Sequence, residues 1–318
     1  MTTTTAGPDA ASGTPVRQRV AGAPISWGVC EVPGWGYQLD PDTVLTQMRE
    51  VGLAATEFGP DGFLPDAPAD KASTLARYRL AAVGQFVPVV LHIPGHDPIP
   101  EGQRAMQGLL AAGASTVVIA AATGGDGYDK RPTIDDQGWA TLLENLDRIN
   151  EAAAAHGLTA TVHPHVGTMV ESGEQTQRVL DGSAIGLCLD TGHLLIGGGD
   201  PVAVAVAHPD RIAHMHLKDV RLSWARRVQD GSVSYTDAVA GGMYVPLGAG
   251  DVDVAAIVTA LESAGYQGWY VLEQDAMLAG KPGENPDGAG LVPDPLDDVR
   301  TSVSYILSVA NRLAGSAH

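Results

Sequence analysis

Short apolar runs alternate with longer amphipathic stretches along most of this chain. Such alternation is typical of repeated strand and helix units, which place their strands in one parallel sheet. The eight predicted strands span Pro24–Cys30, Leu53–Gly59, Ala82–His92, Ser115–Ala121, Leu158–His165, Gly186–Asp190, Ile212–Asp219 and Gly268–Gln274. No glycine-rich G-x-G-x-x-G turn follows the first run, so a closed (β/α)8 TIM barrel is favoured over an open doubly wound α/β sheet.

The stretches between these runs carry helix start and stop signals. Asp40-Pro41 and Asp200-Pro201 each place a capping carboxylate before a proline that suits the first helical turn. Gly52 is placed to end the first of these helices. Further helices are predicted over 137–156, 251–264 and 294–313.

The chain is long enough for one large barrel. Its 318 residues have a hydrophobic content of 44%, and a (β/α)8 barrel takes about 250 residues plus insertions. Residues 1–21 are rich in Thr, Ala, Gly and Pro and have few large apolar side chains, so a flexible leader is expected there. We therefore predict a single barrel domain over 22–318.

The charge balance is strongly acidic, with 37 Asp and Glu against 19 Lys and Arg and a net charge of −18. Such a surface repels the phosphate backbone that supplies most nucleic-acid affinity, so nucleic acid is not an expected partner. The N-terminal residues show no signal pattern, and no run of about 18 apolar residues occurs, so no membrane contact is expected. Cys30 and Cys188 form no spaced framework. These features predict a cytoplasmic protein with buried structural thiols, and they leave homo-oligomerisation open.

One connection breaks the regular spacing, after the seventh predicted strand. Residues 221–250 contain three arginines, two tyrosines and two adjacent glycines before the next predicted helix. So long a connection between strand and helix is usually a functional lid. We expect this long loop to close over a substrate through Arg221, and a partly disordered insertion is the alternative.

Acidic and histidine side chains occur at the C-terminal ends of the last four predicted strands. The segments are VHPH (162–165), LDTGH (189–193), HMHLKD (214–219) and VLEQD (271–275). A parallel barrel gathers these strand ends around one cavity, so the side chains are expected to meet there. Burying so many ionisable groups together is costly unless a cation or substrate satisfies them. The expected metal ligands are His163, Asp190, His216 and Glu273.

Imidazole nitrogens and carboxylate oxygens without thiolate bind first-row divalent cations, and this mixed set favours Mn or Co. His165 competes with His163 as the ligand from the fifth strand. His214 alternates with His216 along one strand and is assigned to structure, with support of the ligand His216 as its alternative role.

Three further residues are candidates for catalysis. Lys218 lies two residues after His216, so strand alternation points both side chains to the same barrel face, where Lys218 is a candidate proton donor. His193 is a candidate proton carrier because the ordinary pKa of histidine is about 6.5. Glu57 ends the second strand and is a candidate base or hydroxyl-binding group.

Other residues near strand ends are expected to shape a substrate pocket by stacking on a ring or binding hydroxyl groups. The candidates for substrate binding are Trp27, Gln85, Phe86, His92, His165 and Arg221. A core position is the alternative for Trp27 and Phe86.

The motifs LDTGH, H-x-H-x-K-D and V-L-E resemble the metal-binding strands of the xylose-isomerase-like barrels, a superfamily of sugar isomerases, epimerases, dehydratases and the endonuclease IV group. Within it, the segments APISWG, ATEFG, VHPHVGT, HMHLKDVR, GGMYVPLGAGDVD and GWYVLEQD resemble the inosose dehydratase family. This resemblance extends over residues 23–275.

The resemblance implies a metal-dependent hydro-lyase of myo-inositol catabolism. Its substrate would be a cyclic polyol ketone, 2-keto-myo-inositol (scyllo-inosose), which loses water to give a trihydroxycyclohexane-1,2-dione. The superfamily commonly uses Glu, Asp, His and Glu as ligands, and His163 stands here at the first position. Replacing one carboxylate by imidazole weakens the symmetric two-carboxylate scheme of an epimerase, whereas an elimination needs no such symmetry.

Three other functions are compatible with the motifs. A keto-sugar isomerase or epimerase would use the same scaffold and ligands, since a fold does not fix a reaction. A barrel that only binds a sugar-like ligand would not need the intact ligand set. A DNA-repair endonuclease would need a basic cleft, which the net charge of −18 disfavours.

Overall fold

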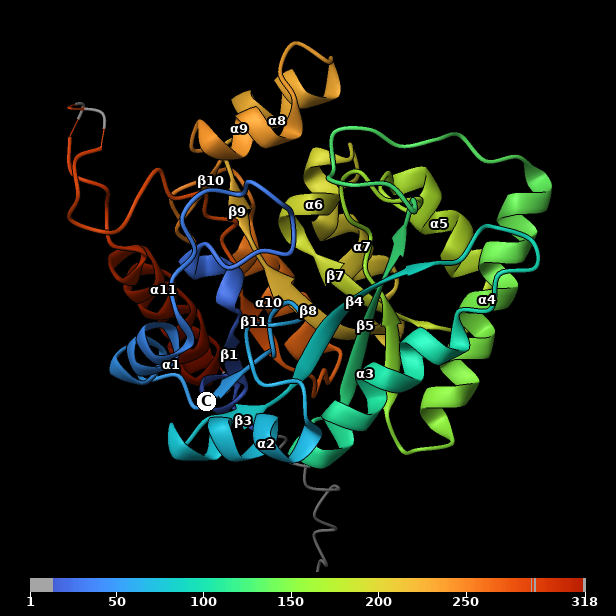
Figure 1. Cartoon of the computed structure of the whole chain (residues 1–318), viewed down its shortest axis with the longest axis horizontal. Helices are drawn as coiled ribbons and strands as arrows, with labels where there is room; N and C mark the ends of the chain where they lie inside the picture. Colours follow the sequence, from blue (N-terminus) through green and yellow to red (C-terminus); the bar gives the residue numbers. More distant parts are fainter. Residues whose placement is uncertain (1–13, 287, 289, 317–318) are drawn as a thin grey trace, which may run out of the picture.

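The computed structural model describes residues 14–286, 288 and 290–316. Nine parallel strands form one sheet in the order β3-β2-β1-β11-β8-β7-β6-β5-β4, and helices surround it (Figure 1). The strands are β1 (Val20–Gly22), β2 (Ala55–Thr56), β3 (Ala81–Ala82), β4 (Gly84–Val90), β5 (Thr116–Ala122), β6 (Thr159–Val162), β7 (Gly186–Asp190), β8 (Ile212–Leu217) and β11 (Tyr270–Leu272).

The two ends of this sheet are consecutive in sequence, because Val83 alone separates β3 from β4. The backbone N–H of Val83 donates to the carbonyl of Thr56 (3.0 Å), and that of Phe58 donates to the carbonyl of Gly84 (3.1 Å). The chain therefore continues from β3 into β4 while staying paired with the β2 segment, and the barrel is nearly closed. The predicted (β/α)8 barrel is confirmed, with its third strand interrupted once.

The first strand was predicted in the wrong place. Residues Pro24–Trp27 form a 3-10 helix that begins with proline and ends at Gly28, whose φ is +79°. The strand is instead Val20–Gly22, which pairs with β11 and β2. The barrel thus includes residues that the sequence assigned to the leader, of which residues 1–13 lie outside the described part of the chain.

The helices begin and end largely where the sequence predicts. Asp40 caps its helix by accepting from the backbone N–H of Thr43 (3.0 Å), and Asp200 caps another by accepting from Val202 (2.9 Å). The helices are α1 (Pro41–Glu50), α2 (Pro68–Arg77), α3 (Ile99–Ala112), α4 (Asp136–Ala154), α5 (Gly173–Gly182), α6 (Thr191–Ile196), α7 (Pro201–Ala207), α8 (Leu222–Gln229), α9 (Tyr235–Ala240), α10 (Val254–Ser263) and α11 (Pro295–Ser316). Their apolar faces and the strands bury one large core, and a smaller separate cluster is formed by Ala21, Ala23, Ala55, Val83 and Val271.

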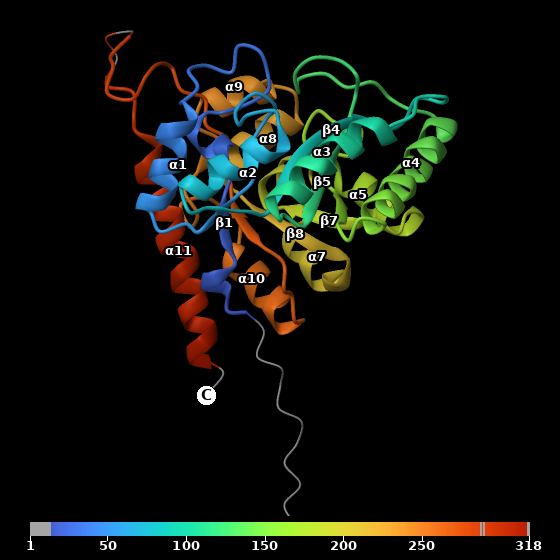
Figure 2. The same cartoon turned by 60° about the horizontal axis from the view of Figure 1, so that its bottom comes forward.

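The connection after β8 is an ordered insert rather than an irregular loop. It contains α8 and α9 and an antiparallel pair of short strands, β9 (Asp219–Val220) and β10 (Tyr244–Val245). Both views show α8 and α9 at one end of the barrel (Figure 2). The predicted long connection is confirmed, and it contains two short helices rather than a disordered insertion.

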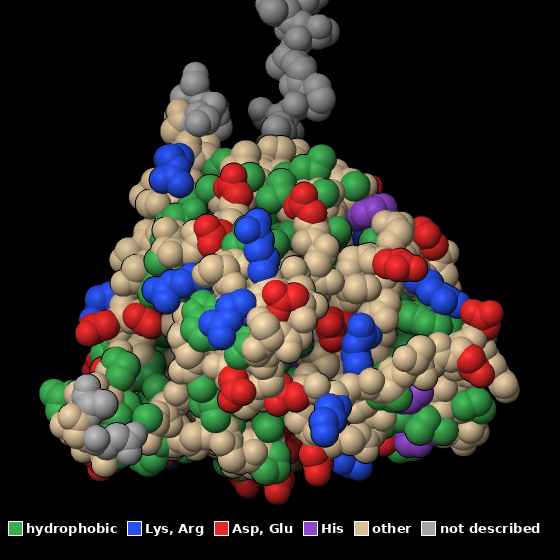
Figure 3. Space-filling model, turned by 90° about the horizontal axis from the view of Figure 1, so that it is seen from above, with side chains coloured by type: hydrophobic (Ala, Val, Ile, Leu, Met, Phe, Trp, Pro, Cys, Tyr) green, Lys and Arg blue, Asp and Glu red, His purple; other side chains and the backbone are tan. Residues whose placement is uncertain are grey.

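No helix in the described part of the chain is long and apolar enough to cross a membrane. The face shown in Figure 3 carries acidic and basic side chains side by side, without a continuous basic area.

Candidate metal centre and active-site pocket

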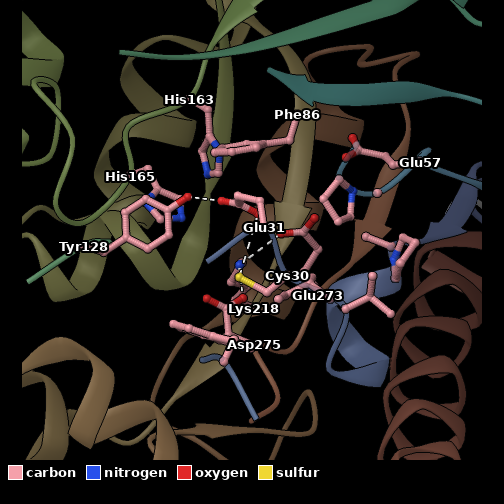
Figure 4. A pocket seen from close by; sticks show the side chains of 17 residues that line it. Cys30, Glu31, Glu57, Phe86, Tyr128, His163, His165, Lys218, Glu273 and Asp275 are labelled. Atoms are coloured by element: carbon pink, nitrogen blue, oxygen red, sulfur yellow. Dashed lines mark hydrogen bonds and ion pairs between the residues drawn. The ribbon is translucent and has the colours of Figure 1, made fainter. Parts of the chain in front are cut away.

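A pocket lies where the C-terminal ends of the barrel strands meet (Figure 4). Its polar wall combines carboxylate, imidazole and ammonium groups that follow four strands, β2, β6, β8 and β11. The chemically active groups on this wall are Glu57, His163, His165, Lys218, Glu273 and Asp275. Apolar and aromatic side chains, including Phe86, Trp35 and Tyr128, complete the lining.

The four predicted metal ligands lie close together, and two of them, His163 and Glu273, line this pocket. His163 Nε2 lies 3.2 Å from Asp190 Oδ2, and His216 Nδ1 lies 3.7 Å from the same oxygen. Glu273 Oε2 lies 3.2 Å from His216 Nδ1. All four residues are buried, so donor atoms from β7, β8 and the ends of β6 and β11 face one small volume.

The local fold directs one oxygen of Asp190 into this cluster. As the N-cap of α6, Asp190 accepts from the backbone N–H groups of Gly192 (2.9 Å) and His193 (2.8 Å) through Oδ1. Its Oδ2 is buried without a hydrogen bond, as are both ring nitrogens of His163 and Nδ1 of His216. Buried polar atoms are normally hydrogen-bonded. A cluster of oxygen and nitrogen atoms without hydrogen bonds therefore indicates a site that suits a cation.

The charge balance supports the same conclusion. The carboxylates of Glu57, Asp190, Glu273 and Asp275 are all buried, and Lys218 is the one ammonium among them. Burial raises the pKa of Asp190 above its ordinary value, because the uncompensated negative charge is costly there. This donor set therefore fits a divalent cation held by His163, Asp190, His216 and Glu273.

Glu57 lies on the side of His216 that faces away from the ligand cluster, and its carboxylate accepts two hydrogen bonds. Its Oε1 accepts from Nε2 of His214 (2.8 Å) and Nε2 of His216 (3.0 Å). Burial opposes ionisation, but the two imidazoles outweigh it and lower the pKa of Glu57 to about 2. Although Glu57, His214 and His216 also converge, these bonds already use the facing atoms, and they fix Nε2 of His216 as the protonated nitrogen.

Lys218 lies between the ligand cluster and the pocket wall. Its Nζ donates to Asp275 Oδ1 and lies 3.0 Å from Glu273 Oε2 and 3.3 Å from His193 Nε2. Burial opposes the charged form, but Asp275 and Glu273 outweigh it and hold the pKa of Lys218 well above its ordinary value. The ammonium group is therefore charged and faces the pocket (Figure 4).

The two remaining histidines differ in their access to the pocket. His165 lines it, and its Nδ1 donates to the carbonyl of Val166 (2.7 Å), so Nε2 is the unprotonated nitrogen of the neutral ring. Burial lowers the pKa of His165 to about 3 and that of His193 well below its ordinary value. His193 packs behind His165 with ring centroids 3.7 Å apart and does not line the pocket.

The predicted substrate-binding residues divide into two groups. Phe86 lines the pocket and meets His163 edge to face, with centroids 5.7 Å apart. Gln85 lies on an adjoining groove that shares the Phe86 wall.

Three other candidates do not reach the pocket. Trp27 is fully buried and donates through Nε1 to Gln47 (2.6 Å), because its segment is helical and turns the indole into the core. Arg221 is exposed and bonds the carbonyl of Gly242 (3.3 Å), since it begins α8 on the outside of the insert. His92 follows β4 beyond the pocket lining.

Several pocket residues were not predicted. Asp275 could have been predicted from the sequence, because it lies two residues after Glu273 and strand alternation turns both side chains to the same face. Tyr235 of α9 does not line the pocket, but its hydroxyl donates to Asp275 Oδ2 (2.6 Å). Tyr128 and Glu31 come from irregular segments and bond each other across the pocket mouth, and no sequence pattern marks them (Figure 4).

Comparison with known proteins shows the same type of barrel. A family model described as a xylose isomerase-like TIM barrel matches residues 45–292. The rhizopine catabolism protein MocC of Rhizobium meliloti is 34% identical over 266 residues, covering 81% of both chains. An inosose dehydratase of Geobacillus thermodenitrificans is 29% identical over 270 residues, covering 81% of this chain and 90% of its own.

Solved structures of other proteins have the same fold as this chain. The IOLI protein with a bound zinc atom superposes with a TM-score of 0.65 at 14% identity, covering 92% of this chain and 98% of its own. An L-ribulose 3-epimerase superposes with a TM-score of 0.65 at 16% identity, covering 94% and 97%.

Proposed function

Since this chain belongs to the xylose isomerase-like TIM barrel family and is an enzyme, we propose that it is a divalent-metal-dependent hydro-lyase that removes water from 2-keto-myo-inositol. The product would be a trihydroxycyclohexane-1,2-dione. The observation that carries this proposal is the set of unpartnered, buried atoms of His163, Asp190 and His216 beside a charged lysine. The similarity to proteins named inosose dehydratase supports the choice of a cyclic polyol ketone over other ketones.

His163, Asp190, His216 and Glu273 would hold the cation, with Mn or Co favoured by the mixed nitrogen and oxygen set. When bound, the cation would supply Lewis-acid stabilisation of negative charge on a substrate ketone oxygen. Hydrogen bonds among the surrounding residues orient the ligand side chains. Glu57 keeps Nδ1 of His216 free to act as a ligand, because its carboxylate accepts a hydrogen bond from Nε2–H of the same ring.

Proton transfer is assigned to two groups that line the pocket, the acceptor nitrogen of His165 and the ammonium group of Lys218. His165 presents an unprotonated Nε2, which would accept the C–H proton next to the ketone. Lys218 would donate a proton to the departing β-hydroxyl, which then leaves as water. The proposed catalytic role of His193 is indirect, because its ring supports His165 and Lys218 from behind.

The decisive experiment is an assay of the purified protein with scyllo-inosose after loading with Mn, Co or Zn. Dione formation is expected with at least one metal, and removal of the metal by chelation should abolish it. D-Allulose and L-ribulose are assayed in parallel for epimerisation at C3. Epimerisation without dione formation would contradict the hydro-lyase assignment and indicate that the protein is an epimerase with the same fold.

Variants test the assigned residues. Lys218→Met and His165→Phe should each lower kcat by about 100-fold or more, because each removes a general acid or base. Asp126→Asn, an exposed carboxylate outside the ligand cluster, serves as the matched control and should keep full activity. Full activity of Lys218→Met would contradict the proposed role of Lys218 as the general acid.

A further inference from the structure

The hydroxyl group of Tyr235 reaches the active site from outside the barrel. Tyr235 begins α9, in the insert that follows β8, yet its side chain is only 2% exposed. Its hydroxyl donates to Asp275 Oδ2 (2.6 Å) and lies 3.1 Å from the hydroxyl of Tyr244. The insert therefore contributes a buried polar atom next to residues that lie at the ends of the barrel strands.

Asp275 links this hydroxyl to the ammonium group of Lys218. The carboxylate is buried and divides its oxygens, with Oδ1 accepting from Lys218 and Oδ2 accepting from Tyr235. A carboxylate held at both oxygens has little freedom to rotate. Tyr235 thus fixes the direction from which Asp275 attracts the lysine.

Lys218 needs such a constraint because carboxylates surround it on two sides. Besides Asp275, its Nζ lies 3.0 Å from Glu273 Oε2 and 3.6 Å from Asp190 Oδ2, which both belong to the ligand cluster. Without the pull of Asp275, the ammonium would move further between these two carboxylates and compete more strongly with a cation for them. Asp275 holds it instead at the pocket wall.

We propose that Asp275 and Tyr235 are positioning residues, through which the α9 insert fixes the Lys218 ammonium group at the pocket wall, beside the metal ligand Glu273. The inference rests on the proposed function for its kinetic test, but its structural test does not. Neither residue contacts the substrate in this scheme, since both act through Lys218.

The structural test uses the small number of lysines. The chain has four, Lys71, Lys130, Lys218 and Lys281, and Lys218 alone is buried. In protein labelled with ¹⁵N-lysine, a buried and hydrogen-bonded ammonium exchanges its protons with water slowly enough to give an NMR signal. The Lys218→Arg variant assigns that signal by its loss.

Tyr235→Phe should raise the proton exchange rate of the Lys218 ammonium by about 10-fold, because Asp275 loses one of its two anchors. Tyr270→Phe is the matched control. It also removes a phenol that donates to a carboxylate, that of Glu262 (2.7 Å), but near the N-terminal end of β11. An unchanged signal in Tyr235→Phe would overturn the proposal, whether or not the protein dehydrates inosose.

The kinetic test separates positioning from substrate binding. Asp275→Asn should lower kcat by about 100-fold and Tyr235→Phe by about 10-fold, with KM changed less than about threefold. The double variant should match Asp275→Asn alone, because Tyr235 acts through Asp275. A rise in KM with unchanged kcat, or multiplicative effects in the double variant, would overturn the proposal. A wild-type protein without dehydratase activity would refute the proposed function instead, and the exchange rate would still decide this inference.

Discussion

At the scale of single residues, His216 uses its two ring nitrogens for different purposes. Nε2 donates to Glu57 (3.0 Å), while Nδ1 faces Asp190 and Glu273 without a hydrogen bond. A neutral imidazole has one donor and one acceptor nitrogen, so the bond to Glu57 leaves the acceptor on the side of the ligand cluster. The sequence placed Glu57 at a strand end but did not reveal that it lies behind a ligand.

Glu57→Gln should weaken metal affinity by about 10- to 100-fold, because the uncharged amide supports the His216 tautomer less well. Isothermal titration of the metal-free protein with Mn or Co measures this. Glu31→Gln is the matched control, since Glu31 also lines the pocket but lies outside the ligand cluster. Equal affinities for the two variants would contradict the role assigned to Glu57.

His163 allows a second test of the ligand set. His163→Ala should remove most metal binding, whereas His163→Glu should keep it and shift the preference toward Mn, because carboxylate oxygen suits Mn better than imidazole does. Metal content after dialysis against equal Mn and Co, measured by mass spectrometry, gives the result. Retention of metal by His163→Ala would favour His165 as the ligand from the fifth strand.

The residues whose positions the sequence predicted well are those at strand ends. Asp190, His216 and Glu273 follow apolar runs, so the barrel geometry alone predicts that they converge. Trp27 failed as a prediction because a short apolar run does not distinguish a strand from a buried helical turn. Tyr235 could not be assigned, because its position depends on how the insert folds back.

At the scale of elements, the insert is tied to the barrel by Asp219. This buried carboxylate accepts from the backbone N–H groups of Gly248 (2.8 Å), Gly250 (3.0 Å) and Val252 (3.0 Å). The backbone at Gly250 approaches so closely that an added Cβ would lie 2.3 Å from Asp219 Oδ1. One side chain thus fixes the turn that leads from β10 to α10.

Asp219→Ala should lower the free energy of unfolding by about 3 kcal/mol, because three backbone donors lose a charged acceptor. Urea denaturation followed by circular dichroism measures the change. Asp126→Ala removes an exposed carboxylate and should change stability by less than about 0.5 kcal/mol. A loss of similar size in both variants would mean that the three bonds contribute little.

The N-cap of α1 predicts a dependence on pH. Hydrogen bonds from Thr43 lower the pKa of Asp40 below its ordinary value of 3.8. The contribution of this cap to stability is therefore present above pH 3.8 and is lost as the pH falls through the lower folded-state pKa. Asp40→Ala should cost about 1 kcal/mol at pH 7.

The difference between wild type and Asp40→Ala should shrink as the pH falls below 3.8. Urea unfolding midpoints at several pH values follow it. A difference that stays constant down to the acid transition would mean that the charged form of Asp40 does not act as the cap.

Helices and strands could be predicted where the signals that start and end them lie within the segment itself. The α1 and α7 helices carry the Asp-Pro start signal, and β7 coincides with its predicted range. The α8 and α9 helices were missed because they are short and lie in a segment whose arginines and glycines suggest a loop. Their stability comes from packing on the barrel, which the local sequence does not show.

At the scale of the whole molecule, a cation that joins four strands should stabilise the barrel. At a free metal concentration of about 100 times the Kd, binding adds about 2.7 kcal/mol. For a chain of this size that corresponds to a rise in Tm of roughly 5 °C. Differential scanning calorimetry with and without Mn or Co measures it.

Asp190→Asn supplies the comparison, because it removes a central ligand while keeping an N-cap for α6. Its Tm should not respond to metal. A response equal to that of wild type would place the cation elsewhere in the chain.

The division of the site between barrel and insert also bears on how such enzymes diversify. The barrel strands supply every proposed cation ligand, whereas α9 supplies a single phenol. Mutations that accumulate in the insert therefore leave the inherited centre intact as long as a hydroxyl persists at position 235.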